Sequence, residues 1–536
     1  MYTANDIKSI INKMSVKQKV GQLFLLAYPG KNPEIIKPLI DEYGIAGCYI
    51  SQDNAETFDE AEQISSKLQA MASRTQNGIP LILGVDQEGS WGVLVPESHT
   101  GPGNLALGAL SDSVRVADMY RVLGEEMLSV GYNALLGPCA DVNLTPDSPI
   151  IGARSFGEDP EKVARCVAYA VQGCTASGAL ATLKHFPGHG STSGDTHREI
   201  PRVERTLDEL FKTDLLPFIK GVEAGADIVM TSHILYPKID PENPATLSPV
   251  ILKDILRNRI GFKGVILSDS MNMGAIRKFY DPAESTLLAL KAGVDIVMLS
   301  EEHYDHSADY LDKQLASLRK AEEAVKSGKL SVQEVDEKLF RILSLKLNKM
   351  QLRTPRLSAQ RYSEAERIQN DISDQCVQVL QKGLWPLPKA GTRICINAAP
   401  ETAYRSLTNA RGIGPNQKKT AYEYFKETLE KSGENFIYLN HNEALTGNED
   451  RFKRAEAILI VTEDYPLPGE DFPKTEQEKL AQKLATKYVE KTVIVGLRSP
   501  YEIKLYPKNV TYLCAFSSRG CAAKSAAKAI LQFPQM

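Results

Sequence analysis

The stretch ALATLKHFPGHGSTSGDTH at residues 179–197 combines the two features that decide the fold. It begins with an almost continuously apolar run, residues 179–185, and continues as a polar loop that contains several glycines. A strand that is buried on both faces of a parallel sheet has such a run, whereas a strand with one solvated face alternates apolar and polar residues. The stretch therefore predicts a buried parallel strand whose carboxyl end opens into a functional loop.

Seven further runs of this kind occur in the first 300 residues, and amphipathic segments separate them. The runs lie at residues 20–26, 45–50, 80–85, 133–142, 228–234, 264–268 and 295–299, and the segments at 54–73, 112–130, 159–176, 206–224, 248–259 and 284–291. Eight strand–helix repeats predict a (β/α)₈ TIM-like barrel. The alternative is an open doubly wound sheet, but its glycine-rich GxGxxG turn is absent from the YPGK sequence at residues 28–31.

The rest of the chain predicts a second domain. Amphipathic stretches at residues 304–326 and 332–349 complete a catalytic barrel domain of residues 1–350, and the polar residues 351–370 predict a linker. Five short apolar runs then predict a smaller αβα sandwich over residues 371–536; they lie at 393–397, 436–440, 457–462, 492–496 and 510–515. A chain of 536 residues agrees with two domains, because single cores stop growing at roughly 250–300 residues.

Composition narrows the function classes. The 63 basic and 67 acidic residues give a net charge of −4, which does not indicate the excess of positive charge typical of nucleic-acid-binding proteins. No apolar run approaches the roughly 20 residues of a membrane helix, and the first residues lack the apolar segment of a signal peptide. The eight cysteines are scattered and form no CxxC motif, which is typical of buried thiols in a reducing compartment. We therefore expect a cytoplasmic protein.

The loop at residues 184–197 holds three of the eight histidines of the chain. A carboxylate at Asp195 can accept a ring N–H from His197 and raise its basicity, which makes the imidazole a proton donor and acceptor near neutral pH. One alternative is a metal site at His185 and His189, but this spacing aligns two ligands only in a helix, and Pro187 argues against one. The other alternative is a polar loop that merely caps the strand ends.

Three other strand ends carry polar side chains. Asp269 follows the run at 264–268 and can serve as a nucleophile, or, alternatively, as the N-cap of the next helix. Asp86 follows the third run and Arg154 follows the fourth. Carboxylates and an arginine at adjacent strand ends suit a polyhydroxylated ligand. The alternative for Arg154 is an ion pair with its neighbours Glu158 or Asp159.

Four segments together resemble glycoside hydrolase family 3. They are MSVKQKVGQL at residues 14–23, GPCADVN at 137–143, IGARSFGEDP at 151–160 and, most specifically, KHFPGHG and DTH within 184–197. The last pattern is similar to the β-N-acetylglucosaminidase branch, which carries its acid/base as a histidine on the barrel. The second half resembles the αβα domain of some Gram-positive members.

The resemblance implies a role for each residue. Asp269 falls at the position of the nucleophile, His197 at that of the acid/base and Asp195 at that of its dyad partner. The positions that bind the non-reducing sugar are occupied by Asp86, Arg154, Lys184 and His185. The implied mechanism is double displacement with retention, and it needs no metal and no organic cofactor.

One departure from the family pattern concerns the sugar. After the DQEG sequence at residues 86–89 the family continues as GRVxR, whereas this chain reads SWGVL at residues 90–94. Both arginines are missing. Trp91 can supply a sugar-stacking face instead, or it can simply pack.

Three functions follow from these observations. The first is a retaining, exo-acting β-N-acetylglucosaminidase that hydrolyses terminal β-linked GlcNAc from soluble glycans or muropeptides, as a monomer or a homodimer. The second is a phosphorylase that cleaves β-N-acetylglucosaminides or β-glucosides with phosphate as the acceptor. A β-glucosidase of the same family is a further alternative. The third is a non-catalytic sugar-binding protein. For the second domain we expect packing against the barrel or dimerisation.

Overall fold

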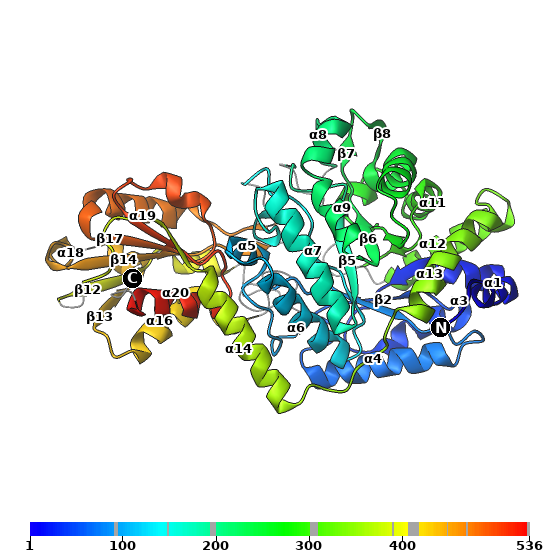
Figure 1. Cartoon of the computed structure of the whole chain (residues 1–536), viewed down its shortest axis with the longest axis horizontal. Helices are drawn as coiled ribbons and strands as arrows, with labels where there is room; N and C mark the ends of the chain where they lie inside the picture. Colours follow the sequence, from blue (N-terminus) through cyan, green and yellow to red (C-terminus); the bar gives the residue numbers. More distant parts are fainter. Residues whose placement is uncertain are drawn as a thin grey trace.

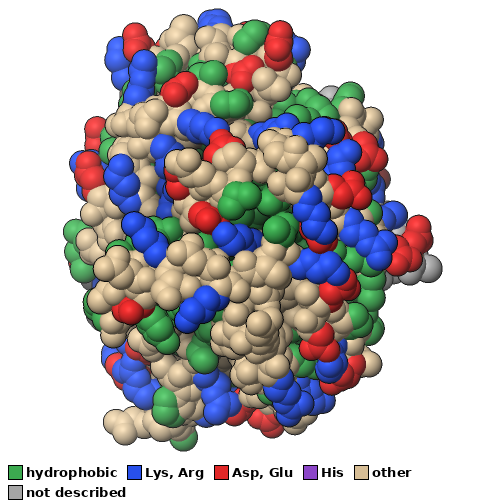
Figure 2. All heavy atoms as spheres, turned by 90° about the vertical axis from the view of Figure 1, so that its right-hand side faces the viewer, with side chains coloured by type: hydrophobic (Ala, Val, Ile, Leu, Met, Phe, Trp, Pro, Cys, Tyr) green, Lys and Arg blue, Asp and Glu red, His purple; other side chains and the backbone are tan. Residues whose placement is uncertain are grey.

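A computed structural model gives the fold of the chain (Figure 1). It describes all residues except 90–94, 147–149, 193–199, 301–308, 389–390, 406–416, 447–448, 468–469 and 533–536. Across the face shown in Figure 2, basic and acidic side chains are interspersed, as the small net charge leads one to expect. In the part of the chain that the structure describes, no helix is long and apolar enough to cross a membrane.

Eight short parallel strands form the first sheet. They are β1 (Phe24–Leu26), β2 (Gly47–Ile50), β3 (Ile82–Val85), β4 (Ala134–Leu135), β5 (Leu180–Phe186), β6 (Ile228–Thr231), β9 (Val265–Leu267) and β10 (Val297–Met298). Their order is β10-β1-β2-β3-β4-β5-β6-β9, and a parallel bridge between Leu267 and Ile296 closes the ring. Every residue of these strands is buried, which explains the continuous apolar runs. The predicted (β/α)₈ barrel is confirmed, and an open sheet is wrong for this part of the chain.

Helices surround the barrel. They are α1 (Ala4–Lys13), α2 (Val16–Gly21), α3 (Lys37–Tyr43), α4 (Phe58–Ser73), α5 (Asn104–Ala109), α6 (Arg115–Ser129), α7 (Pro160–Ser177), α8 (Leu207–Lys212), α9 (Leu216–Glu223), α10 (Gly274–Arg277), α11 (Pro282–Ala292), α12 (Tyr310–Lys326) and α13 (Val332–Asn348). A π-helix, η4 (Val250–Arg259), takes the place of one α-helix, and a hairpin of β7 (Leu235–Tyr236) and β8 (Asp240–Pro244) lies outside the ring. Short 3-10 helices are η1 (Pro33–Ile35), η2 (Gly152–Arg154) and η3 (Ala245–Leu247).

Several predicted boundaries in the barrel differ from the structure. Strand β4 covers only Ala134–Leu135 of the run predicted at residues 133–142. The first strand begins at Phe24 rather than at residue 20, because a capping box between Ser15 and Gln18 starts α2, which runs through Val20. The helix predicted at residues 206–224 is two helices, α8 and α9. The first ends at Lys212, and the second starts at Leu216 with a proline in its first turn.

The second sheet has six strands in the order β11-β18-β17-β14-β12-β13. The five predicted strands are present and parallel: β12 (Arg393–Asn397), β13 (Phe436–Leu439), β14 (Ala457–Thr462), β17 (Thr492–Gly496) and β18 (Thr511–Cys514). An antiparallel edge strand, β11 (Gln378–Gln381), was not predicted. Its four residues are not buried, so they lack the apolar run of the central strands.

Helices cover both faces of this sheet. Ile458 and Ile460 of β14 pack in the core that includes α19 (Thr475–Lys487), whereas Leu459 and Val461 pack in the core that includes α16 (Ala421–Lys431) and α20 (Gly520–Gln532). The remaining elements are α17 (His441–Leu445), α18 (Glu449–Arg454), η5 (Glu401–Tyr404), η6 (Val489–Lys491), η7 (Tyr501–Leu505) and a small hairpin of β15 (Pro466–Leu467) and β16 (Glu470–Asp471). The predicted αβα sandwich is confirmed.

A long helix, α14 (Ala359–Cys376), joins the two sheets (Figure 1). Residues 351–370 were predicted to be a linker, but the second half of that segment is helical. Four buried residues at a spacing of three and four give the signal that the prediction missed: Ala365, Ile368, Ile372 and Cys376. The helix contacts both parts of the chain, since Arg361 pairs with Glu125 of α6 and Asp374 pairs with Lys528 of α20.

Candidate active site

Five of the predicted site residues lie at the carboxyl end of the barrel strands. Asp86 follows β3, Arg154 ends η2, and Asp269 follows β9 by two residues. Lys184 and His185 are among the last three residues of the strand β5. Parallel strands present their carboxyl ends at one face of a barrel, and enzymes with this fold carry their active sites there.

Arg154 makes a buried ion pair with Glu88. Its Nε lies 2.9 Å from Glu88 Oε2 and its Nη2 lies 2.9 Å from Oε1, and the Lys184 Nζ lies 2.5 Å from the same Oε1. Burial alone would raise the pKa of Glu88, but the two cations outweigh it and lower the pKa to about 2. The alternative ion pair of Arg154 with Glu158 or Asp159 is wrong, because Arg154 turns inward to Glu88.

Asp86 is the member of this charged group that remains accessible. Lys184 Nζ donates to its Oδ1 at 2.6 Å and the Tyr49 hydroxyl donates to its Oδ2 at 2.9 Å. The side chain of Asp86 is 25% exposed, whereas that of Glu88 is 0% exposed. Asp86 is therefore placed to accept hydrogen bonds from a ligand, and Glu88 is placed to hold the two cations.

Asp141 fixes the orientation of His185. Asp141 Oδ2 lies 2.8 Å from His185 Nδ1, and Oδ1 accepts the backbone N–H groups of His185 at 3.2 Å and His189 at 2.6 Å. Burial opposes ionisation, but His185 beside it keeps the pKa of Asp141 well below its usual range. Arg154 Nη2 lies 3.3 Å from His185 Nε2. Because arginine can only donate hydrogen bonds, His185 Nε2 accepts a hydrogen bond from Arg154, and His185 Nδ1–H donates one to Asp141.

The atoms that the alternative metal site would need are already hydrogen-bonded. His185 Nδ1 is held by Asp141, and His189 Nδ1 lies 2.8 Å from Thr192 Oγ1. Burial, then His185, lowers the pKa of His189 to about 4. Ligand-type atoms of Cys139, Asp141 and His185 lie within 4.8 Å of one another, with the Cys139 thiol donating to Asp141 at 3.1 Å. We assign this group to hydrogen bonding that orients His185.

Asp269 is an ionised carboxylate with a partly exposed side chain. Burial raises its pKa, but His185, His233 and the backbone N–H of Ser270, which donates to Oδ1 at 2.7 Å, lower it further than burial raises it. A carboxylate that stays charged at neutral pH suits a nucleophile. The N-cap alternative is wrong, since the helix after Asp269 is α10 and its N-cap residue is Met273.

His233 supports Asp269 and was not predicted. Its Nε2 lies 2.9 Å from the Ser270 carbonyl and its Nδ1 lies 2.9 Å from Thr246 Oγ1. His233 lies two residues after β6, so its position near the end of a strand was the available signal. Glu88 and Asp141 were also not predicted as site residues. They lie in the segments at residues 86–89 and 137–143, whose sequences carry the resemblance and the Asp86 prediction.

Three predicted site residues lie outside the described residues. They are Trp91, Asp195 and His197. Gly89, which precedes Trp91, follows β3, and Thr192, which precedes Asp195 and His197, follows β5. Asp86 also follows β3, and Lys184 lies in β5.

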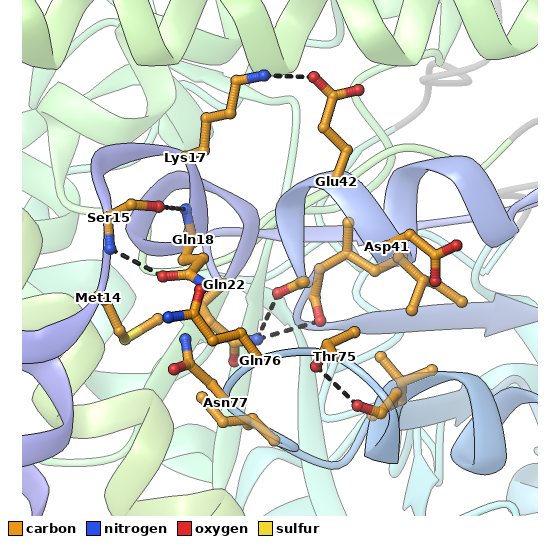
Figure 3. Close-up of a pocket in the computed structure, with 16 residues that line it drawn as sticks. Met14, Ser15, Lys17, Gln18, Gln22, Asp41, Glu42, Thr75, Gln76 and Asn77 are labelled. Carbon is orange, nitrogen blue, oxygen red and sulfur yellow. Dashed lines mark hydrogen bonds and ion pairs between the residues drawn. The ribbon is translucent and has the colours of Figure 1, made fainter.

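A separate cavity of about 220 Å³ lies at the opposite, amino end of the barrel strands (Figure 3). Its polar side chains bond to one another and to the backbone. The Gln22 amide donates to the carbonyls of Gly44 and Ile45, and Gln18 donates to Gln76. Because these groups already have partners and no described site residue lines the cavity, we give it no part in the reaction.

The charged side chains lie at the barrel face where enzymes with this fold carry their active sites, and a family match gives the class of protein. Residues 15–345 match the family described as "Glycosyl hydrolase family 3 N terminal domain". The chain belongs to glycoside hydrolase family 3. The predicted family and enzyme class are confirmed.

Individual relatives extend the comparison. The chain is 31% identical over 333 residues to a β-hexosaminidase A of Pseudoalteromonas piscicida, covering 59% of this chain and 55% of that protein, so it spans about half the length of that relative. It resembles the solved structure of a family 3 β-N-acetylglucosaminidase from Paenibacillus, with a TM-score of 0.83, 27% identity and 96% of each chain covered. It shares the fold of a β-glucoside phosphorylase bound to 2FGlc, with a TM-score of 0.80, 20% identity, and 99% of this chain and 94% of that chain covered.

Proposed function

We propose that the protein is a retaining β-N-acetylglucosaminidase that releases terminal β-linked GlcNAc from soluble glycans or muropeptides. The observation that carries this proposal is the ionised, partly exposed Asp269 at the end of the barrel that also holds the charged group of Asp86, Glu88, Arg154 and Lys184. The likeness to the Paenibacillus β-N-acetylglucosaminidase over 96% of both chains supports the choice of sugar.

The reaction proceeds in two displacements. Asp269 attacks the anomeric carbon and forms a glycosyl ester, while His197, oriented by Asp195, protonates the leaving oxygen. His197 then takes a proton from water, which attacks the anomeric carbon and frees Asp269. A neutral sugar binds by hydrogen bonds, so Asp86 accepts from hydroxyl groups and Lys184, Arg154 and His185 complete the polar wall. Trp91 offers a stacking face for the sugar ring.

We place this activity in the cytoplasm, in the recycling of cell-wall fragments. All eight cysteines are unpaired and seven of them are buried, which agrees with a reducing compartment. Soluble disaccharides and muropeptides are the class of substrate that an exo-acting enzyme meets there. The protein acts as a monomer or a homodimer.

Product analysis tests the proposal. The enzyme is incubated with an aryl β-N-acetylglucosaminide in phosphate buffer and in a buffer without phosphate, and the sugar product is identified by mass. We expect free GlcNAc at similar rates in both buffers. GlcNAc-1-phosphate that forms only with phosphate would instead establish a phosphorylase, and turnover of the aryl β-glucoside alone would establish a glucosidase. Sugar binding without any product would leave the non-catalytic alternative.

A further inference from the structure

The second domain contacts the barrel loop that carries Arg154. This loop runs from Asn143, two residues after Asp141, to Glu158 at the start of α7. Tyr501, the first residue of η7, contacts the first residue of the loop. Its hydroxyl accepts a hydrogen bond from Asn143 Nδ2 at 2.8 Å. One hydroxyl from the second domain thus holds the loop at Asn143.

A second residue of the same domain contacts the middle of the loop. Arg498 Nη2 lies 3.3 Å from the position that a Cβ atom would take on Gly152, which precedes Arg154 by two residues. Arg498 is itself held by Asp464, with 3.2 Å between Nη1 and Oδ1. The side chain of Arg498 is nearly buried, so it packs on the loop backbone rather than extending into solvent.

The loop transmits these contacts to the site through its own hydrogen bonds. The Asn143 N–H donates to the Gly157 carbonyl at 2.9 Å, so the two ends of the loop lie side by side. The Thr145 N–H donates to the Gly190 carbonyl at 3.0 Å, which ties the loop to the segment after β5. The Arg154 carbonyl accepts from Asn104 Nδ2 at 2.7 Å. Arg154 is therefore presented to Glu88 from a loop that Tyr501 holds at Asn143.

We propose that Tyr501 is a positioning residue for sugar binding: it holds the loop that presents Arg154 before the substrate arrives. This inference rests on the proposed role of Arg154 in the sugar site. A binding group that is already held in place binds more tightly, because the ligand does not have to order it. Loss of the Tyr501 hydroxyl leaves Asp269, which follows β9, untouched, so sugar affinity falls while the chemical step keeps its rate.

The test compares the change Tyr501→Phe with the matched change Tyr438→Phe. Tyr438 lies on β13 of the same domain, and its hydroxyl has no hydrogen-bond partner among the described residues. Steady-state kinetics are measured on p-nitrophenyl β-N-acetylglucosaminide, or on the p-nitrophenyl β-glucoside if wild type turns over only that sugar. For Y501F we expect KM to rise about fivefold to tenfold with kcat within about twofold of wild type. For Y438F we expect no change in either constant.

The double variant separates positioning from a general loss of structure. If Tyr501 acts through Asn143, the variants Y501F, N143A and their combination all raise KM by a similar factor, because they break one connection. A KM for Y501F that equals that of wild type, a loss confined to kcat, or effects that simply multiply in the double variant would each overturn the inference. Failure of the proposed function would be seen separately, in the products of the wild-type enzyme.

Discussion

Buried carboxylates gather at the carboxyl ends of the strands in both parts of the chain, but their partners differ. In the barrel, Glu88 is paired with two cations, and its pKa is lowered to about 2. In the second domain, Glu463 follows β14 and accepts hydrogen bonds from the hydroxyls of Tyr404 and Tyr465, and burial raises its pKa. Glu502 of η7 accepts from Thr462 and Tyr506, and burial raises its pKa to about 7.

The difference indicates which region can do chemistry. A carboxylate that is matched by cations stays charged, and the charges around it are available to orient a polar ligand. A carboxyl group without a cation beside it has its pKa raised by burial, even though tyrosine hydroxyls donate to it, and it serves as a hydrogen-bonded cross-link. We therefore assign the reaction to the charged barrel end and a structural role to the tyrosine-rich cluster.

The largest expected effect is on turnover. The change Asp269→Asn removes the proposed nucleophile but keeps the size of the side chain, so we expect kcat to fall by about 10³-fold or more. The isosteric change Glu463→Gln in the second domain leaves kcat within about twofold of wild type. Both values come from initial rates on the same aryl glycoside. Equal losses in the two variants would break the comparison between the regions.

The next effect is on stability. Glu88→Gln leaves two buried cations without a full counter-charge, so we expect the free energy of unfolding to drop by about 2–4 kcal/mol. Glu463→Gln leaves no buried cation without a counter-charge, and we expect a loss below about 1 kcal/mol. Urea unfolding of both variants at pH 7 measures the difference. A larger loss for Glu463→Gln would show that the tyrosine-rich cluster depends on a charge.

The two clusters also respond to pH in opposite directions. The folded-state pKa of Glu502, about 7, lies above the usual 4.5, so the folded state holds a proton that the unfolded chain has lost between these values. Stability from this group is complete below about pH 4.5 and is lost as the pH rises through 7, by about 3 kcal/mol. Glu88 behaves in the reverse way, since its pKa is lowered and its contribution is lost as the pH falls from 4.5 toward 2.

Unfolding measured from pH 5 to pH 8 tests this difference. Relative to wild type, E502Q is expected to become progressively more stable as the pH rises through that range. The control is E490Q, the same change at an exposed glutamate of η6 in the same domain, which is expected to follow the wild-type curve. Parallel curves for wild type and E502Q would contradict the assignment of a neutral Glu502 below pH 7.

The smallest effects concern helix caps, where the two regions should not differ. Asp281 accepts the N–H groups of Ala283 and Glu284 at the start of α11, and Thr420 forms a capping box with Glu423 at the start of α16. Each change to alanine is expected to cost about 1 kcal/mol of unfolding free energy and to leave KM unchanged. Thermal unfolding and initial rates measure both. A change in KM in either variant would show that the capped helix is coupled to the active site.

The barrel and the sandwich were predictable from the sequence because strands buried on both faces leave an unambiguous apolar run. All eight barrel strands and the five parallel strands of the second sheet were found in this way. The edge strand β11 and the start of β1 were not predicted correctly. Strand β11 is not buried and therefore has no apolar run, and the start of β1 depends on the helix cap of α2, which lies outside the run. Helix α14 was not predicted because its polar residues far outnumber its four buried apolar residues.

The site was predictable to the extent that it lies at strand ends. Asp86, Lys184 and Asp269 each come within two residues of a strand, and parallel strands bring their ends together. Partners that depend on side-chain direction were not predictable. Arg154 turns to Glu88, 66 residues away, rather than to its sequence neighbours, and Asn143 bonds to Tyr501, 358 residues away.

The central claim is that Asp269 forms a covalent bond to the sugar. A fluorinated N-acetylglucosaminyl donor, whose ester is released slowly, is incubated with the enzyme, and the digested protein is analysed by mass spectrometry. We predict that the peptide containing Asp269 gains the mass of one fluorinated sugar residue, and that the peptide from the Asp269→Asn variant does not. A label on any other residue, or the same label in the variant, would contradict the account.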